Sequence, residues 1–228
     1  GGWTLREPVP GQADAARIGQ LVRELQFIEQ REVAGFEPPD TDLAQLALEL
    51  SLWGVQDPAQ LLWLTPPRQG GYQQARELLQ SLGALTGSGR ITAAGRELAG
   101  LAVHPRLGHM LLQGKKMGQA SLACDLAAIL SERDILRNSI DAPTADLQNR
   151  LNLLSLWRQD KAAAVKDNGG DPGACRRVDK NARNWLQRLH ERRKPCDPEA
   201  AGLLLAFAYP DRVARRRRGK QEDYLLSS

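Results

Sequence analysis

The 228-residue sequence has few cysteines and no long hydrophobic run. Its three cysteines, Cys124, Cys175 and Cys196, are odd in number and widely spaced, which is typical of a reducing compartment rather than of a secreted disulfide scaffold. No apolar stretch approaches the roughly 20 residues that cross a bilayer, and the first residues show no signal-peptide pattern. We therefore expect a cytoplasmic protein that has no membrane partner.

Motifs of common catalytic and metal-binding sites are also absent. The nearest approach to a phosphate-binding loop, Gly114-Lys115-Lys116, lacks the upstream glycine and the following Ser or Thr. It is predicted to be a helix C-terminus whose lysines complement the helix dipole. His104, His109 and His190 have no metal-ligand spacing with the cysteines, and Cys196 has no neighbouring base that would make it a nucleophile. We expect no catalytic residue, metal or cofactor in this chain.

Hydrophobic residues (42%) and charged residues (25%) are present in ordinary proportions for a soluble globular protein. The chain is long enough to bury one substantial core or two small ones. Its net charge of +4 is unevenly distributed, because residues 151–228 carry 17 basic and 10 acidic side chains (+7) and residues 1–150 carry 14 and 17 (−3). A basic C-terminal third is typical of a surface near phosphates, although charge alone is equally typical of a solvated face.

Periodic hydrophobic residues predict a mainly helical chain. A Pro- and Gly-bounded lead-in of uncertain structure occupies residues 1–39 and contains one amphipathic segment at 15–34. The Phe36-Glu37-Pro38-Pro39 stretch ends it, because a proline disfavours the helical conformation in the residue before it. Short helices are then expected at three places: 42–53, 58–64 and 72–82.

Two short apolar pieces around a Gly-Ser-Gly turn at residues 84–92 predict a small β-hairpin. Thr92 is then placed to cap a helix that ends at Leu101. Three helices followed by a β wing are the outline of a winged-helix domain, which we assign to residues 40–101.

The remaining sequence predicts a helical bundle over residues 102–208, joined at 167–173 by a flexible Asn-, Gly- and Pro-rich connection. Residues 209–228 are expected to be a basic linker and the first strand of a truncated β domain, with Tyr224-Leu225-Leu226 opening a strand whose partners lie beyond the chain. The helices expected in the bundle are 104–114, 119–133, 144–159, 174–193 and 198–208.

Two groups of basic residues are candidates for nucleic-acid binding. Arg176, Lys180 and Arg183 have spacings of four and three, which places them on one helix face able to follow a phosphate backbone. Trp185 lies among them in sequence and could stack on a base, although tryptophans on apolar helix faces more often anchor a core. The second group is the densest charge in the chain and comprises Arg215, Arg216, Arg217 and Arg218, which suit an RNA contact or a solvated loop.

Several stretches, taken in order, resemble the C-terminal accessory region of bacterial DEAH-box ATP-dependent helicases, and in particular those of the HrpB type. The resemblance extends over residues 36–226, and its specificity comes from the order and spacing of the pieces. They are Thr41-Asp42-Leu43, Leu48-Glu49-Leu50-Ser51-Leu52-Trp53-Gly54, Trp63-Leu64-Thr65-Pro66-Pro67, Leu82-Gly83-Ala84-Leu85, Gly89-Arg90-Ile91-Thr92, Gly95-Arg96, His104-Pro105-Arg106-Leu107-Gly108-His109-Met110-Leu111, Leu126-Ala127-Ala128-Ile129-Leu130-Ser131-Glu132-Arg133-Asp134 and Ala208-Tyr209-Pro210-Asp211-Arg212-Val213-Ala214.

The resemblance implies a winged-helix domain, a helicase-associated ("ratchet") bundle and the start of a small β domain. These elements would pack on RecA-like motor domains of the same parent protein and guide single-stranded RNA or DNA past them. ATP and Mg²⁺ are expected for the parent's motor core. Residues 1–35 do not resemble the family, and no ATPase motif is present, so we expect a piece truncated at both ends that is inactive alone.

Two other functions fit the sequence. The chain could be a free-standing winged-helix regulator that reads duplex DNA through the helix at 72–82, although Arg76 is the one basic residue there and Glu77 follows it. It could also be a protein-interaction adaptor whose basic stripe meets an acidic partner.

Overall fold

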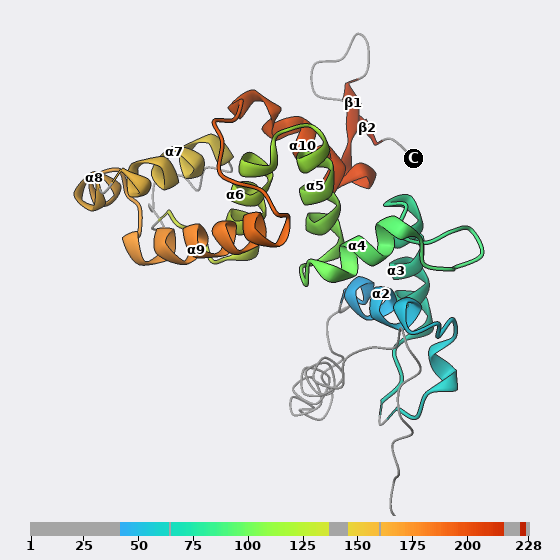
Figure 1. The fold of residues 1–228 in the computed structure, drawn as a ribbon. Coiled ribbons are helices and arrows are strands. Elements are labelled where there is room, and N and C mark those ends of the chain that lie inside the picture. The colour runs from blue at the N-terminus through green and yellow to red at the C-terminus, as the bar shows by residue number, and fades with distance from the viewer. Residues whose placement is uncertain (1–41, 64, 137–145, 160, 217–223, 227–228) are drawn as a thin grey trace, which may run out of the picture. The chain divides into compact units, whose positions relative to one another are not determined.

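The computed structural model describes residues 42–63, 65–136, 146–159, 161–216 and 224–226 (Figure 1). Most of these residues are helical, which confirms the predicted mainly α class. The amphipathic segment expected at 15–34 lies outside the described residues. The chain divides into two compact units at the Ala99–Gly100 peptide bond.

The first unit is built around α2 (Ala44–Leu52), which packs on α3 (Gln69–Ser81). Helix α2 is buried on nearly every side, because leucine and alanine occupy all its faces. Asp42 begins it by accepting a hydrogen bond from the Ala44 N–H at 2.9 Å. The unit ends with α4 (Ala93–Gly100), and the Thr92 hydroxyl accepts from the Gly95 N–H at 3.0 Å, so the predicted cap is confirmed.

The helix expected at 58–64 is wrong, since its described residues, 58–63, form only one 3-10 turn, η1 (Pro58–Gln60). The backbone becomes extended at Leu61, and the Trp63 indole N–H donates to the Pro58 carbonyl at 2.6 Å. That carbonyl is thereby bonded to a side chain as well as to the Leu61 N–H. A segment this short gains too few backbone hydrogen bonds to offset helix nucleation.

The hairpin expected at 84–92 is reduced to one isolated antiparallel bridge between Leu85 and Ile91. The turn itself forms as a tight loop, with the Thr86 N–H bonded to the Arg90 carbonyl at 2.8 Å. Helix α3 ends at Ser81 and α4 begins at Ala93, and Leu85–Ile91 is the one bridge that the structure describes between them.

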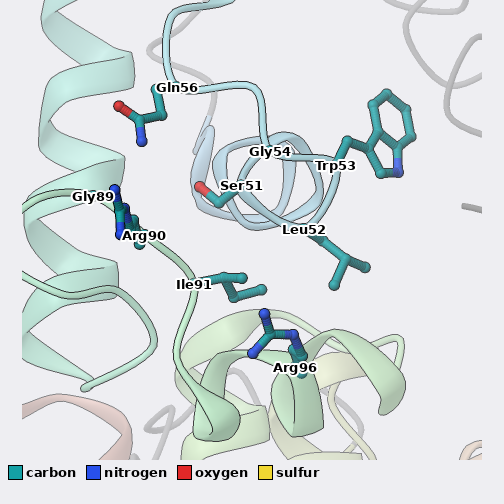
Figure 2. Close-up of a pocket in the computed structure, with 9 residues that line it drawn as sticks. All are labelled: Ser51, Leu52, Trp53, Gly54, Gln56, Gly89, Arg90, Ile91 and Arg96. Atoms are coloured by element: carbon teal, nitrogen blue, oxygen red, sulfur yellow. The ribbon is translucent and has the colours of Figure 1, made fainter. Parts of the chain in front are cut away.

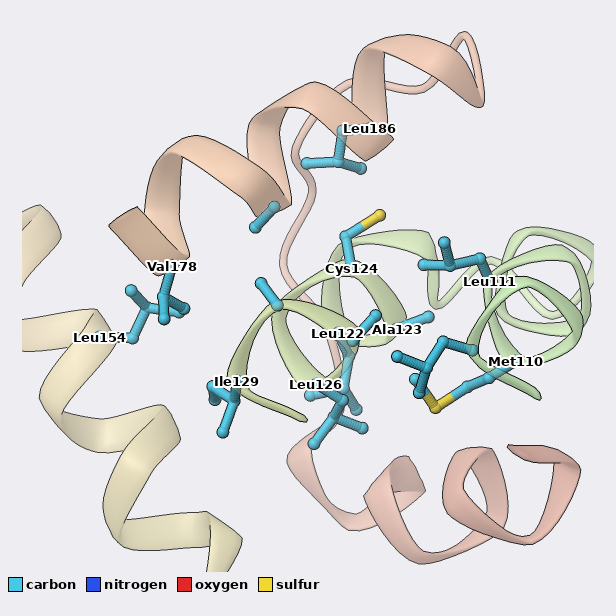
Figure 3. Close-up of a cluster of buried hydrophobic side chains, with 14 of the residues drawn as sticks. Met110, Leu111, Leu122, Ala123, Cys124, Leu126, Ile129, Leu154, Val178 and Leu186 are labelled. Carbon is cyan, nitrogen blue, oxygen red and sulfur yellow. The ribbon is translucent and has the colours of Figure 1, made fainter. Parts of the chain in front are cut away.

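The second unit is a helical bundle centred on α6 (Ala120–Ser131), whose residues from Ala120 to Ile129 are all buried. Figure 3 shows the α6 side chains between those of the neighbouring helices, Leu111 of α5 and Leu186 of α9 among them. The helices packed on α6 are α5 (Pro105–Lys116), α7 (Leu147–Arg158), α9 (Pro172–Arg188) and α10 (Ala201–Ala208).

Gly114 is inside α5 and not at its end, so the helix terminus predicted at Gly114 is wrong. A Cβ built on Gly114 would lie 2.5 Å from the Ala123 Cβ of α6, which no real contact tolerates. The glycine therefore allows α5 and α6 to approach closely. The helix continues to Lys116 and is ended by Gly118, whose φ is +70°. Lys115 and Lys116 do occupy the last turn, as predicted.

The connection predicted to be flexible at 167–173 is ordered structure. It follows α8 (Ala162–Asp167), a short helix that hydrophobic periodicity did not indicate. Gly170 is buried, forms a bridge with Leu136, and would bring a Cβ within 2.7 Å of Val165. Asp171 then caps α9 by accepting from the Gly173 N–H at 2.7 Å. The glycine at 170 allows close packing and the asparagine at 168 ends α8, so neither residue marks a mobile segment.

The C-terminal elements are the 3-10 turns η2 (Pro198–Ala200) and η3 (Pro210–Arg212) and the strands β1 (Ala214–Arg216) and β2 (Tyr224–Leu226). The two strands pair antiparallel, with Ala214 opposite Leu226. The strand predicted at 224–226 exists, and it pairs with β1 of the same chain, whereas its partners were expected beyond residue 228.

Candidate nucleic-acid interface

Helix α9 has a buried face and an exposed face. Cys175, Val178, Asp179, Ala182 and Leu186 are buried against the bundle. Arg176, Lys180 and Arg183 are all exposed, so the structure places the three residues of this basic stripe together on the solvent side of α9. Cations in this arrangement are spaced along about two helical turns.

The three cations of the stripe differ in what holds them. Arg176 lies over the ring of Trp157, with 5.8 Å from its guanidinium carbon to the ring centroid, a cation–π contact. Arg183 forms an ion pair with Asp179, one helical turn before it. Lys180 makes no ion pair with any residue that the structure describes. Two of the three cations therefore have a partner within the bundle, and Lys180 has no ion-pair partner among the described residues.

A network of three arginines and two buried aspartates lies beneath this face; we call it the arginine–aspartate network. Arg158 donates to both Asp125 carboxylate oxygens, at 2.7 and 2.8 Å, and to Asp179 at 2.7 Å. Arg193 donates to the same two oxygens of Asp125, both at 2.9 Å, and Arg183 completes the network on Asp179. The network joins α6, α7, α9 and the segment after α9.

Its carboxylates are buried and its guanidiniums reach solvent. The side chains of Asp125 and Asp179 are each 7% exposed, against 23% for Arg158, 33% for Arg193 and 67% for Arg183. Three positive and two negative charges leave a net of +1, with the positive groups outermost. Each guanidinium has N–H donors beyond those that the aspartates use.

The electrostatics of the network follow from this geometry. Burial raises the pKa of Asp179, but hydrogen bonds and charge from Arg158 and Arg183 outweigh it and hold that pKa below its ordinary value. Burial lowers the pKa of Arg158, and its bonds to Asp125 and Asp179 more than reverse the effect, so the Arg158 pKa is raised. Asp179 and Arg158 are therefore both charged at neutral pH.

Trp185 is half-buried and packs against the core, on a different side of α9 from the exposed stripe. The aromatic ring that the structure brings to the stripe is Trp157 of α7. Arg215 and Arg216 form part of β1, whereas Arg217 and Arg218 lie outside the described residues.

Sequence reasoning missed Arg158, Arg193 and Asp125. Asp125 offered a signal, because an aspartate inside the apolar run of α6 needs a buried partner. Its partners come from 33 and 68 residues along the chain, and no periodicity identifies them.

The part of the chain that the structure describes contains no group of three or more His, Cys, Asp or Glu side chains arranged to hold a metal ion. Among the same residues, no helix has the length and hydropathy to cross a membrane.

Comparison with known proteins identifies relatives of both units. A family profile described as "Helicase associated domain (HA2), winged-helix" matches residues 75–103. The ATP-dependent RNA helicase HrpB of Escherichia coli K12 is 35% identical over 201 residues, which are 87% of this chain and 21% of that protein. The ATP-dependent RNA helicase HrpA of the same organism is 30% identical over 131 residues, 55% of this chain and 10% of that protein.

The same likeness is found among solved structures. A crystal structure of the E. coli DExH-box NTPase HrpB matches with a TM-score of 0.60 at 34% identity, covering 86% of this chain and 21% of that one. A second, of the E. coli DEAH/RHA helicase HrpB, matches with a TM-score of 0.60 at 35% identity, covering 86% and 22%. The chain thus spans about a fifth of the length of HrpB.

Fold and family match together define a helicase-associated region with a winged-helix segment and a helical bundle. The chain is homologous to the C-terminal region of DEAH/RHA helicases such as HrpB and HrpA. The resemblance to the accessory region of HrpB-type helicases is confirmed.

Proposed function

We propose that this chain is the nucleic-acid-channel module of a cytoplasmic, ATP-dependent RNA or DNA helicase of the HrpB type. It guides a single strand past the RecA-like motor domains of the same parent protein. ATP and Mg²⁺ act in those motor domains, and no residue described above is assigned to either.

The observation that carries the proposal is the exposed face of α9. Arg176, Lys180 and Arg183 are exposed, while Asp179, the carboxylate that pairs with Arg183, is buried. Phosphates would meet the positive groups first. A row of exposed cations can hold the phosphates of a flexible single strand without recognising its base sequence.

The arginine–aspartate network adds preorganisation to this face. Asp179 orients Arg183, and Asp125 orients Arg193, before any strand is bound. A guanidinium already fixed in place loses less conformational entropy on contacting a phosphate than a free side chain does. Arg193 therefore joins the stripe as a candidate phosphate contact.

Residues 214–226 extend the proposal to a second element. On this view β1 and β2 are the first strands of the small β domain that the family resemblance implies, and two of the four candidate arginines, Arg215 and Arg216, belong to β1.

A winged-helix regulator of duplex DNA is less well supported. The exposed part of α3 carries glutamines and Glu77. Its one cation, Arg76, is half-buried and donates to the Gln56 carbonyl at 3.3 Å. Helix α3 therefore lacks the exposed cations that major-groove recognition helices use.

The test is the affinity for a fluorescein-labelled single-stranded oligouridine, measured by anisotropy between 50 and 200 mM salt. Neutralising Arg176, Lys180 and Arg183 to Gln removes three phosphate contacts. The logarithmic salt slope should then fall in magnitude by about 2, since each contact on a single strand contributes roughly 0.7.

The matched control neutralises three exposed cations outside α9: Lys116, Lys161 and Lys166. It has the same change in net charge and should leave most of the affinity intact. Equal affinity and slope in the α9 variant and the unmodified chain would overturn the proposal, as would equal losses in the α9 variant and the control.

A further inference from the structure

Positive charge in the described part of the first unit is concentrated at one place. Residues 42–99 contain four arginines and no lysine, against five acidic residues. Arg90 and Arg96 line a hollow of about 400 Å³ between the end of α2 and the loop before α4 (Figure 2). Arg76 lies at its rim, so three of the four arginines surround one small space.

Arg76 is fixed across this rim. It donates to the Gln56 carbonyl at 3.3 Å, and a Cβ added to Gly89 would lie 2.0 Å from its guanidinium nitrogen. Gln56 and Gly89 both line the hollow. Gly89 also has a φ of +79°, a backbone conformation that favours glycine.

No side chain that lines the hollow is acidic. Arg90 and Arg96 are exposed, and neither forms an ion pair with any residue that the structure describes. Leu52 and Ile91 supply half-buried aliphatic walls, and Figure 2 shows Arg96 reaching toward both of them. The hollow thus combines an uncompensated positive charge with an apolar surface, and its volume is within the range of ligand pockets.

An open backbone edge runs along the same space. The Thr86 N–H bonds the Arg90 carbonyl and the Thr92 N–H bonds the Ala84 carbonyl. These bonds flank the Leu85–Ile91 bridge, so Leu85 and Ile91 are a non-hydrogen-bonded pair and the N–H and C=O of Ile91 point away from Leu85. Neither group is hydrogen-bonded to a residue that the structure describes.

We propose that this hollow binds an extended acidic peptide segment, which adds alongside residues 90–92 and places carboxylates against Arg90 and Arg96. Backbone pairing at an open edge, with side chains in alternating pockets, is a general mode of peptide recognition. Apolar residues of the segment would contact Leu52 and Ile91.

Peptide suits the hollow better than nucleic acid. Sequence-independent single-strand sites provide aromatic rings on which bases stack. Figure 2 shows the Trp53 ring directed away from Arg90 and Arg96, and none of the other residues that line the hollow is aromatic. The peptide site is in a different unit from α9 and does not depend on the function proposed for α9.

The probe is a fluorescein-labelled heptapeptide in which glutamate and valine alternate, titrated with the full chain at 100 mM salt. The comparison peptide alternates lysine and valine. We expect the acidic peptide to bind and the basic one not to, with Arg90→Glu and Arg96→Glu each weakening binding at least tenfold. The control is Arg68→Glu, the fourth arginine among residues 42–99, which should change affinity less than twofold.

Circular dichroism melting checks that each variant is folded. We expect all three to fold, because these arginines are on the surface. The proposal is overturned if the acidic peptide does not bind, if both peptides bind equally, or if Arg68→Glu weakens binding as much as the other two. The proposal would also be overturned if oligouridine displaced the acidic peptide from the unmodified chain and oligouridine binding were lost in Arg90→Glu. That result would reassign the hollow to nucleic acid. If the α9 substitutions lower the oligouridine affinity and Arg90→Glu and Arg96→Glu do not, the peptide assignment stands.

Discussion

Replacing Arg158 by methionine tests whether the arginine–aspartate network holds the bundle together. The change removes three charge-assisted hydrogen bonds of 2.7 to 2.8 Å and leaves two carboxylates that are 7% exposed with one arginine each. Removing one partner of a buried ion pair costs about 3–5 kcal/mol. Because Arg183 and Arg193 remain, we expect the lower end, a loss of about 3 kcal/mol in the free energy of unfolding.

The measurement is urea unfolding at pH 7 followed by far-ultraviolet circular dichroism. The control is Arg177→Met, because Arg177 is 54% exposed and lies 3.6 Å from Glu132. An exposed pair of this kind is worth about 0–1 kcal/mol. Adding Asp179→Asn to Arg158→Met should cost less than the sum of the two single changes. A loss below about 1 kcal/mol in Arg158→Met, or strict additivity with Asp179→Asn, would refute the reasoning.

The pH dependence has a definite sign. The pKa of Asp179 in the folded chain is below its ordinary value, so the network stabilises the fold above the unfolded-state pKa of about 3.9. That contribution is lost as pH falls through the lower folded-state pKa. The difference between the unmodified chain and Arg158→Met should therefore be complete at pH 7 and shrink below about pH 4.

Three further predictions concern packing, capping and thiol reactivity. Gly114→Ala should destabilise the chain by about 1–3 kcal/mol in urea unfolding, because its Cβ has no space, whereas Gly202→Ala, with nothing within 4 Å, should stabilise it by about 0.5–1 kcal/mol. Asp171→Ala removes the cap of α9 and should cost about 1 kcal/mol by the same measurement. Burial raises the pKa of Cys124 to about 12, so a thiol reagent at pH 8 should label the more accessible Cys196 first, and Cys196→Ser should abolish that early phase.

Helices were predictable where one face is apolar over several turns. The α5 and α6 segments were expected at 104–114 and 119–133 and are within a few residues of those bounds. Helix α8 was not, because six residues with one buried side chain carry no periodic signal. Residues 167–173 contain the glycines and asparagine typical of a mobile loop, and only the packing of Gly170 against Val165 and Leu153 shows why a glycine is needed there.

The candidate site was predictable in the part that helical spacing determines. Spacings of four and three place Arg176, Lys180 and Arg183 on one face of any helix, and that face is exposed in α9. Spacing does not show which cations are already paired. The partner of Arg183 is a local residue, whereas Arg158 and Arg193 meet Asp125 only after the bundle has formed.

Formal charge therefore overstates what the basic third of the chain can offer to phosphates. Three of the 17 basic side chains of residues 151–228, namely Arg158, Arg183 and Arg193, are bound to Asp125 and Asp179, and these arginines serve stability as well as surface charge. Neutralising Arg183 perturbs both properties at once, because it removes a partner of a buried carboxylate. Lys180 touches neither aspartate, so a change there alters the field of α9 and leaves the network intact. A loss of strand affinity in Lys180→Gln without a change in unfolding free energy would separate the two roles.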